Sequence, residues 1–91
     1  MKARVRLIVK GKVQGVFFRM FAQSVARKLG VTGWIRNNPD GTVEAVGEGD
    51  KKALVELVEK LKKGPLLSDV REVKQKWSEP TGEFTGFEIK Y

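Results

Sequence analysis

The sequence predicts an α+β fold of the ferredoxin-like, split βαβ type, in which an antiparallel sheet of four to five strands carries two helices on one face. The length of 91 residues is that of one domain, expected to span residues 1–91. Strand-like and helix-like apolar spacings follow one another in the order β-α-β-β-α-β, with a further short strand at the end. No linker, repeat or low-complexity stretch interrupts this order.

The first strand and the first helix are indicated by the spacing of apolar residues. Between residues 2 and 10, apolar side chains alternate with charged ones, as in a half-buried strand. Gly11 to Gly15 then form a glycine-flanked loop. A helix is expected to begin near Phe18, because apolar residues recur three or four positions apart as far as Leu29. Gly30 is suited to end it.

A hairpin, a second helix and two strands follow. Strands are expected over residues 31–37 and 42–47, joined by a turn that contains Pro39-Asp40-Gly41. Asp50 is expected to cap a helix that ends at Gly64-Pro65. Residues 70–77 are predicted to form a strand, and alternation over residues 87–91 predicts the last one, after a turn at 79–82.

The charge of the chain is concentrated in its first half. The whole chain has 18 Lys+Arg, 11 Asp+Glu and a net charge of +7. Residues 1–39 hold nine basic residues and no acidic ones, whereas residues 40–91 hold nine basic and eleven acidic ones, so that the two parts carry +9 and −2. A first half with this positive charge is expected to attract anions. Nucleic acid, anionic membranes and small phosphorylated molecules are all compatible with it, and so is a charge that only keeps the surface soluble.

The residue types that are missing exclude several kinds of chemistry. There are no cysteines and no histidines, so disulfides, thiolate nucleophiles, imidazole bases and zinc fingers are excluded. No apolar run approaches the roughly 20 residues of a membrane helix, and the N-terminus lacks the apolar core of a secretory signal. We therefore expect a cytoplasmic protein that does not act at a membrane.

The segment from Gly11 to Arg19 is the first candidate site. Its two glycines allow backbone amides to turn inward, and the helix that follows offers unpaired N–H groups at its positive end. Arg19 would add a fork of donors that matches phosphate oxygens. These residues therefore fit a phosphate cradle, and they equally fit an ordinary strand-to-helix turn with a solvated arginine.

The second candidate site is the hairpin around Asn37. The carboxamide of Asn37 could accept a proton from water and hold its oxygen in place, although asparagine is also common in turns. Asp40 is interpreted as a turn residue rather than a base, and Glu44 and Arg36 as solvated strand residues. The sequence leaves open whether Trp34 belongs to the core or to a surface platform.

Together these two segments resemble the acylphosphatase family. Val9 through Arg19 fits its pattern aliphatic-x-Gly-x-Val-Gln-Gly-Val-x-Phe-Arg. Gly33 through Val43 fits its pattern Gly-aromatic-aliphatic-x-Asn-x-x-x-Gly-x-Val, with an isoleucine at position 35 where Val or Ala is usual. The resemblance covers nearly the whole chain, because length, element order and the aromatic final strand also agree.

The resemblance implies an enzyme that hydrolyses acyl phosphates to a carboxylate and inorganic phosphate, without a cofactor or metal. It implies that Arg19 binds the phosphoryl group together with the backbone amides of the cradle, and that Asn37 positions the attacking water. It also implies that the terminal carboxylate, here on Tyr91, lies near the arginine. Inorganic phosphate is expected as product and competitive inhibitor, and the protein as a monomer. The cradle amides are those of Gly15, Val16, Phe17 and Phe18.

Two other classes of protein compete with this interpretation. The same fold class includes RNA-recognition domains, but the expected strands lack their cluster of exposed aromatic residues, so no nucleic-acid partner is predicted. Acylphosphatase-like domains also occur at the start of large hydrogenase-maturation proteins. A domain that binds phosphate or senses a small molecule without turnover is therefore the second alternative.

Overall fold

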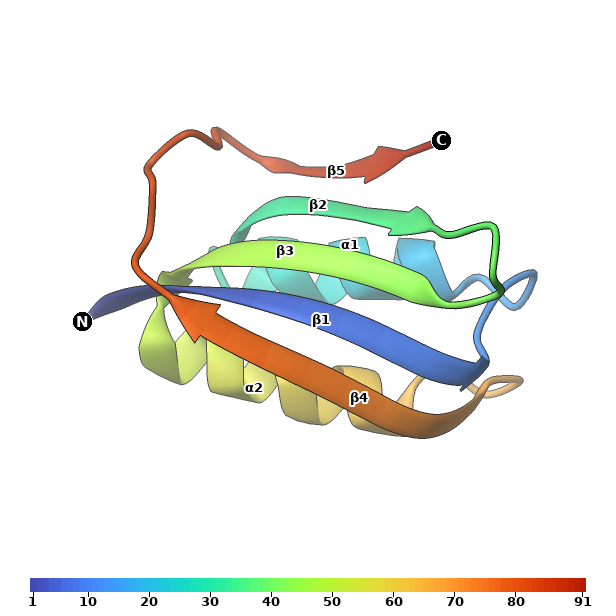
Figure 1. Ribbon diagram of the computed structural model, residues 1–91. Coiled ribbons are helices and arrows are strands. Elements are labelled where there is room, and N and C mark those ends of the chain that lie inside the picture. The colour runs from blue at the N-terminus through green and yellow to red at the C-terminus, as the bar shows by residue number, and fades with distance from the viewer.

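The computed structural model describes residues 1–91 and shows five strands in one sheet with both helices on one face of it (Figure 1). This confirms the predicted α+β class and the order of the elements. Neither helix is long and apolar enough to cross a bilayer. The elements are β1 (Lys2–Lys12), α1 (Phe18–Lys28), β2 (Thr32–Asn37), β3 (Val43–Asp50), α2 (Lys51–Lys63), β4 (Asp69–Ser78) and β5 (Phe87–Lys90).

The sheet has the strand order β4-β1-β3-β2-β5 and is mixed rather than wholly antiparallel. The first four strands pair antiparallel, as expected, whereas β5 pairs parallel with β2, from Gly33 opposite Phe87 to Arg36 opposite Lys90. Because of this pairing, β1, β2 and β5 all finish at the end of the molecule where α1 begins (Figure 1). An antiparallel β5 would carry Tyr91 to the opposite end.

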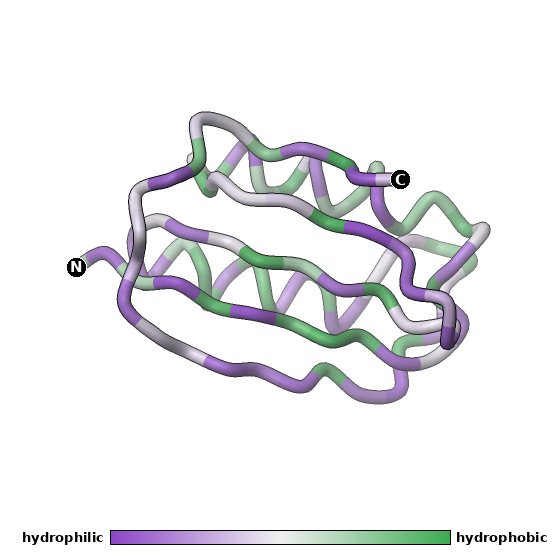
Figure 2. The backbone as a smooth tube through the Cα atoms, turned by 45° about the horizontal axis from the view of Figure 1, so that its top comes forward, coloured by the Kyte–Doolittle hydropathy of each residue, from purple (hydrophilic) through white to green (hydrophobic).

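The core lies between the sheet and the two helices. In β1, Val5, Leu7 and Val9 are buried while their neighbours are more exposed. Figure 2 shows hydrophobic and hydrophilic stretches following one another along this strand. Phe18 and Leu54 cover the sheet from α1 and α2. Seventeen buried apolar residues form one cluster, so the amphipathic patterns in the sequence all bury their apolar sides in one place.

The start of α2 differs from the expected capping arrangement. Asp50 occupies the N-cap position but makes no capping hydrogen bond with its side chain. Its carboxylate lies 3.5 Å from the amino group of Met1 instead. The charge of this amino group is the main cause that lowers the pKa of Asp50. The helix ends where expected, because Gly64 adopts a φ of 68° and its N–H bonds the carbonyl oxygen of Lys60.

Glu44 is buried on the sheet face away from the helices, so its interpretation as a solvated residue is wrong. Arg6 approaches its carboxylate to 2.6 Å and Arg36 to 2.9 Å, and these long side chains cover it. Burial acts to raise the pKa of Glu44, but the hydrogen bond from Arg36 and the charge of Arg6 outweigh it and lower the pKa. Arg36 is half exposed, as predicted.

Candidate active site

A cleft of about 300 Å³ opens at the end of the molecule where α1 begins. It brings together Arg19 and Asn37, which the sequence places in two separate segments. It also adjoins most of the predicted cradle, although the side chain of Val16 points into the core and does not line the cleft. Nine residues line it: Val13, Gly15, Phe17, Phe18, Arg19, Met20, Asn37, Ile89 and Tyr91.

The loop before α1 has the backbone shape of an anion-binding concavity. Gly15 has a φ of 72° and Phe17 a φ of 61°, and Phe17 is the one residue other than glycine with a positive φ. The φ angle therefore changes sign from Gly15 to Val16 and again to Phe17, a pattern that turns successive N–H groups toward one side. No backbone carbonyl accepts a hydrogen bond from Gly15, Val16 or Phe17.

The first turn of α1 adds to the positive potential of this loop. Phe17 is its N-cap and supplies no side-chain hydrogen bond, and the turn holds no acidic residue. The first N–H groups of the helix thus have no acceptor, and the positive end of the helix dipole faces the cleft. These N–H groups and the loop amides together form a set of donors suited to an anion.

Arg19 lies in the same turn and has no carboxylate partner. Its Nη1 is 3.4 Å from the carbonyl oxygen of Lys90, and its guanidinium carbon lies 5.0 Å from the centre of the Tyr91 ring. The carboxylate of Tyr91, which the resemblance places near this arginine, forms no salt bridge with it, and the aromatic ring of Tyr91 lies beside the guanidinium. Arg4 and Arg6, by contrast, pair with glutamates. Arg19 therefore keeps its full charge for a ligand.

Asn37 is the last residue of β2 and faces α1, on the same side of the sheet as Ile35. Its side-chain oxygen Oδ1 is buried and has no hydrogen-bond partner in the protein. A buried acceptor without a hydrogen bond lowers the stability of the fold by about 1–3 kcal/mol. Such an acceptor therefore persists where a ligand or solvent molecule supplies the missing donor. This finding favours a role in the cleft over that of an ordinary turn residue.

Gln14 is a site residue whose role sequence reasoning missed. Its Nε2 donates to the carbonyl oxygen of Asn38 at 2.8 Å and to that of Thr42 at 3.0 Å. These bonds fasten the loop before α1 to the hairpin that carries Asn37. The signal in the sequence was the glutamine of the first pattern, but its partners lie 24 and 28 residues away and no local spacing indicates them.

The remaining residues of the hairpin have structural roles. Asp40 accepts hydrogen bonds from the hydroxyl and the N–H of Thr42, and these bonds lower its pKa, in keeping with its interpretation as a turn residue. Trp34 lies on the open face of the sheet, with Lys90 and Arg36 over its ring. No group of three or more acidic side chains is gathered where it could hold a metal ion.

The fold and the cleft define an α+β protein of the ferredoxin-like class with a cationic cleft at one end of its sheet. The family model for Acylphosphatase matches residues 5–89. The acylphosphatase of Pelotomaculum thermopropionicum is 49% identical over 90 residues, which cover 99% of this chain and 98% of the relative. The chain belongs to the acylphosphatase family and is an enzyme of the hydrolase class.

Two solved structures share this fold. The crystal structure of the acylphosphatase from Bacillus subtilis has a TM-score of 0.95 at 39% identity and covers 98% of this chain and 99% of its own. A full-length HypF, described in a phosphate- and nucleotide-bound form, has a TM-score of 0.91 at 28% identity over 100% of this chain but 12% of its own. The same fold thus occurs both as nearly a whole protein and as a small part of a large one.

Proposed function

We propose that this enzyme hydrolyses the carboxyl-phosphate bond of acyl phosphates by direct attack of water on phosphorus. Arg19 and the amides of Gly15, Val16, Phe17 and Phe18 hold the phosphoryl group, and Asn37 positions the water. One observation carries the proposal: the cleft joins an unpaired arginine, free amides and the buried, unpaired Oδ1 of Asn37. Membership of the acylphosphatase family supports it.

The donors of the cradle suit the charge that the reaction develops. A transferring phosphoryl group spreads negative charge over its three equatorial oxygens, and catalysis consists mostly of positioning and charge stabilisation. Fixed amides at a helix N-terminus are already oriented and need no rearrangement during the reaction. The guanidinium of Arg19 adds charge-assisted hydrogen bonds to two of the oxygens.

The carboxamide of Asn37 supplies what a nucleophilic water needs. Its Oδ1 accepts a hydrogen bond from one O–H of the water, which leaves a lone pair of the water oxygen free to face phosphorus. The oxygen–phosphorus bond forms as the bond from phosphorus to the acyl oxygen breaks, and the electron pair leaves with the carboxylate. The proton of the water passes to the phosphate oxygens of the substrate.

The chemistry of the leaving group explains why these groups suffice. A carboxylic acid has a pKa of about 4, so the departing carboxylate needs no proton from a general acid at neutral pH. The enzyme has no histidine or cysteine to supply one. Neither a cofactor nor a covalent intermediate is part of the proposed reaction.

The test is the hydrolysis of benzoyl phosphate in the presence of a chelator, with inorganic phosphate as inhibitor. We expect turnover that the chelator does not reduce and competitive inhibition by phosphate. If the protein binds phosphate but shows no turnover, the proposal is wrong and the protein is a phosphate-binding domain. Turnover that the chelator abolishes would show that a metal takes part and would overturn the proposed metal-independent mechanism.

A further inference from the structure

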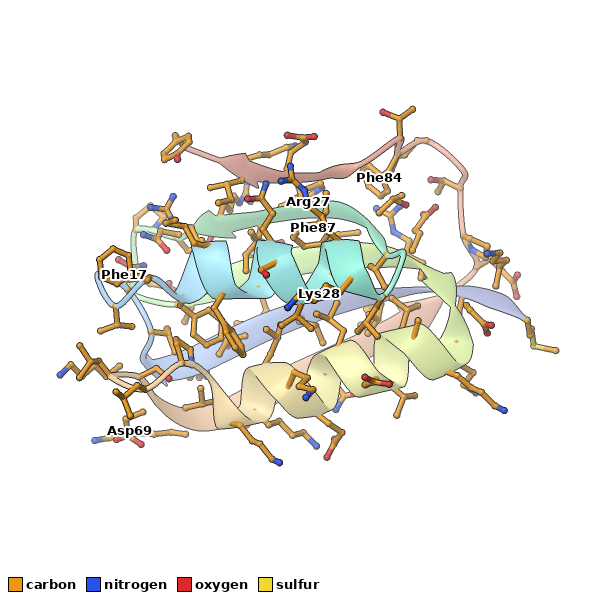
Figure 3. All side chains as sticks on the ribbon, turned by 180° about the vertical axis from the view of Figure 1, so that it is seen from behind. Phe17, Arg27, Lys28, Asp69, Phe84 and Phe87 are labelled. Atoms are coloured by element: carbon orange, nitrogen blue, oxygen red, sulfur yellow. The ribbon has the colours of Figure 1, made fainter.

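Three of the seven large apolar side chains that are exposed to solvent lie together at the cleft. Phe17 is 73% exposed, Met20 is 61% exposed, and Tyr91 is fully exposed. Figure 3 shows Phe17 at the end of the molecule, on the loop that precedes α1. Apolar side chains clustered in solvent around a cleft mark a surface that binds an apolar group. The proposed function assigns a role to none of these three side chains.

The backbone of Phe17 supports a functional reason for its exposure. Its φ of 61° and ψ of 24° are in the left-handed region, which bulky side chains disfavour. The protein thus holds a phenylalanine in a strained conformation without burying its ring. Strain of this kind persists at positions where it contributes to function. The cradle accounts for the backbone of this residue but not for its side chain, since an asparagine or glycine would adopt the same conformation more easily.

The cleft has room for more than a phosphoryl group. A phosphoryl group and the oxygen that joins it to the acyl group, five heavy atoms in all, occupy about 150 Å³ if each atom takes the volume of a water molecule. The cleft measures about 300 Å³, and six of its nine lining residues are apolar. Arg19 is the one charged side chain among them, and it faces the phosphoryl group in the proposed reaction. The remaining space therefore offers no cation for a second negative charge.

We propose that Phe17, Met20 and Tyr91 form an acyl subsite, which makes apolar acyl phosphates the preferred substrate class. The Tyr91 ring lies 5.0 Å from the guanidinium carbon of Arg19. The apolar surface therefore adjoins the arginine that binds phosphate, just as the acyl group of the substrate adjoins its phosphoryl group. The subsite rests on the proposed function, because it places the phosphoryl group at Arg19.

The test compares acetyl phosphate with butyryl phosphate, whose leaving carboxylates have nearly the same basicity. Two fully buried methylenes would favour butyryl phosphate about 15-fold. The subsite is open to solvent and buries them only in part, so we expect kcat/KM to favour butyryl phosphate about fivefold. Met20→Gln keeps the length and helix propensity of the side chain but removes its apolar end, and should reduce this ratio to about twofold. Val55→Gln changes a similarly exposed helical residue outside the cleft and should leave the ratio at its original value.

A binding measurement separates this inference from the proposed function. Methylphosphonate and propylphosphonate carry the same anionic head and are not hydrolysed, and calorimetry gives their dissociation constants. We expect the propyl compound to bind about fivefold tighter, and Met20→Gln to remove most of this difference. Tighter binding of the propyl compound without any turnover of acyl phosphates would retain the subsite and reject the proposed function. Turnover with equal kcat/KM values and equal dissociation constants would retain the function and reject the subsite.

Discussion

The side-chain amide of Gln14 lies 2.8 Å from the main-chain carbonyl oxygen of Asn38, the residue that follows Asn37 in the chain. A second hydrogen bond, of 3.0 Å, joins the same nitrogen to the carbonyl oxygen of Thr42. The proposed phosphate cradle and the proposed water-positioning residue belong to different loops, and Gln14 connects these loops directly. The distance between phosphorus and the attacking water thus depends on a side chain that need touch neither.

Gln14→Met should lower kcat while changing stability little. The methionine fills the same space but donates no hydrogen bond. The two carbonyl oxygens keep one partner each, the N–H of Gly41 and that of Asn38, so we expect a loss of about 1 kcal/mol in unfolding free energy. A displacement of either loop should reduce kcat at least tenfold, because misplacement by about 1 Å is costly in rate. Steady-state kinetics and chemical denaturation measure the two effects.

A positioning role for Gln14 is separated from a merely structural one by two further measurements. The inhibition constant of inorganic phosphate should rise less than threefold in Gln14→Met, because the cradle itself is intact. Gln14→Glu removes the donor with less change of shape, and it should lower kcat as well. A kcat that stays within a factor of two in both variants would contradict the role.

Arg19→Gln should weaken phosphate binding and slightly stabilise the fold. The loss of charge-assisted hydrogen bonds should raise the inhibition constant of phosphate by roughly 30-fold or more, equivalent to about 2 kcal/mol. A cation in the first turn of a helix opposes the helix dipole, so its removal should increase stability by about 0.3–0.5 kcal/mol. Phosphate inhibition and thermal unfolding at low salt are the measurements.

Arg27→Gln is the matched control, because this arginine lies in the last turn of the same helix. There the dipole favours a cation, and the substitution should reduce stability by about 0.3–0.5 kcal/mol while leaving phosphate inhibition unchanged. If both variants weakened phosphate binding equally, the effect would belong to the net charge and not to the cleft.

Asn37→Ala should abolish most of the turnover without destabilising the protein. If its carboxamide holds the nucleophile, the barrier rises by about 3 kcal/mol, a loss in kcat of more than 100-fold. The substitution also removes a buried acceptor that has no partner, so the unfolding free energy should stay the same or rise by up to about 1 kcal/mol. Inhibition by phosphate should persist in this variant.

Asn38→Ala serves as the control for Asn37→Ala. Its side chain donates to the hydroxyl of Thr42 at 3.0 Å and so supports the turn. We expect this variant to lose about 1 kcal/mol of stability and to keep most of its activity, the reverse of the effect at Asn37. Loss of phosphate inhibition in Asn37→Ala would contradict the division of roles between Asn37 and Arg19.

Local patterns in the sequence were sufficient for the strands and the helices, whereas the expectation that Arg19 and Asn37 share one site came from the resemblance to the acylphosphatase family. Alternation and helical spacing depend on neighbours in the chain, and the two motifs are each continuous. Three features could not be predicted in this way. Gln14 bonds residues in a distant hairpin, β5 joins the sheet edge in parallel, and Glu44 is buried by Arg6 and Arg36 from adjacent strands. Each of these three features depends on which segments become neighbours in the folded chain. Alternation within one strand does not specify these neighbours.

Glu48 should make the stability of the protein sensitive to acid. It is buried on the open face of the sheet and accepts hydrogen bonds from Arg4, from Thr81 and from the N–H of Gly82. Burial acts to raise the pKa of Glu48, but these bonds outweigh it and lower the pKa from 4.5 to about 2. Because the folded pKa is the lower one, the stabilisation is complete above pH 4.5 and is lost as the pH falls toward about 2.

Glu48→Gln tests this pH dependence. At neutral pH the variant should unfold about 2 kcal/mol more easily than the original protein, because the charged acceptor of several hydrogen bonds is lost. The difference should shrink between pH 4.5 and about 2, where the glutamate itself becomes protonated. Thermal unfolding at several pH values measures it, with Glu56→Gln as an exposed control. A difference that stays constant down to pH 2 would show that the ionised carboxylate is not the stabilising species.

Phe17→Asn should stabilise the fold while it weakens the preference for apolar acyl groups. Asparagine tolerates the left-handed conformation that Phe17 adopts, and the lost ring was exposed, so we expect a gain of about 0.5–1 kcal/mol and a rise in Tm of a few degrees. Phe17→Ala removes the same ring but retains most of the strain, so it should lose the acyl preference without the gain in stability. A lower Tm for Phe17→Asn than for Phe17→Ala would show that backbone strain at this position does not reduce the stability of the protein.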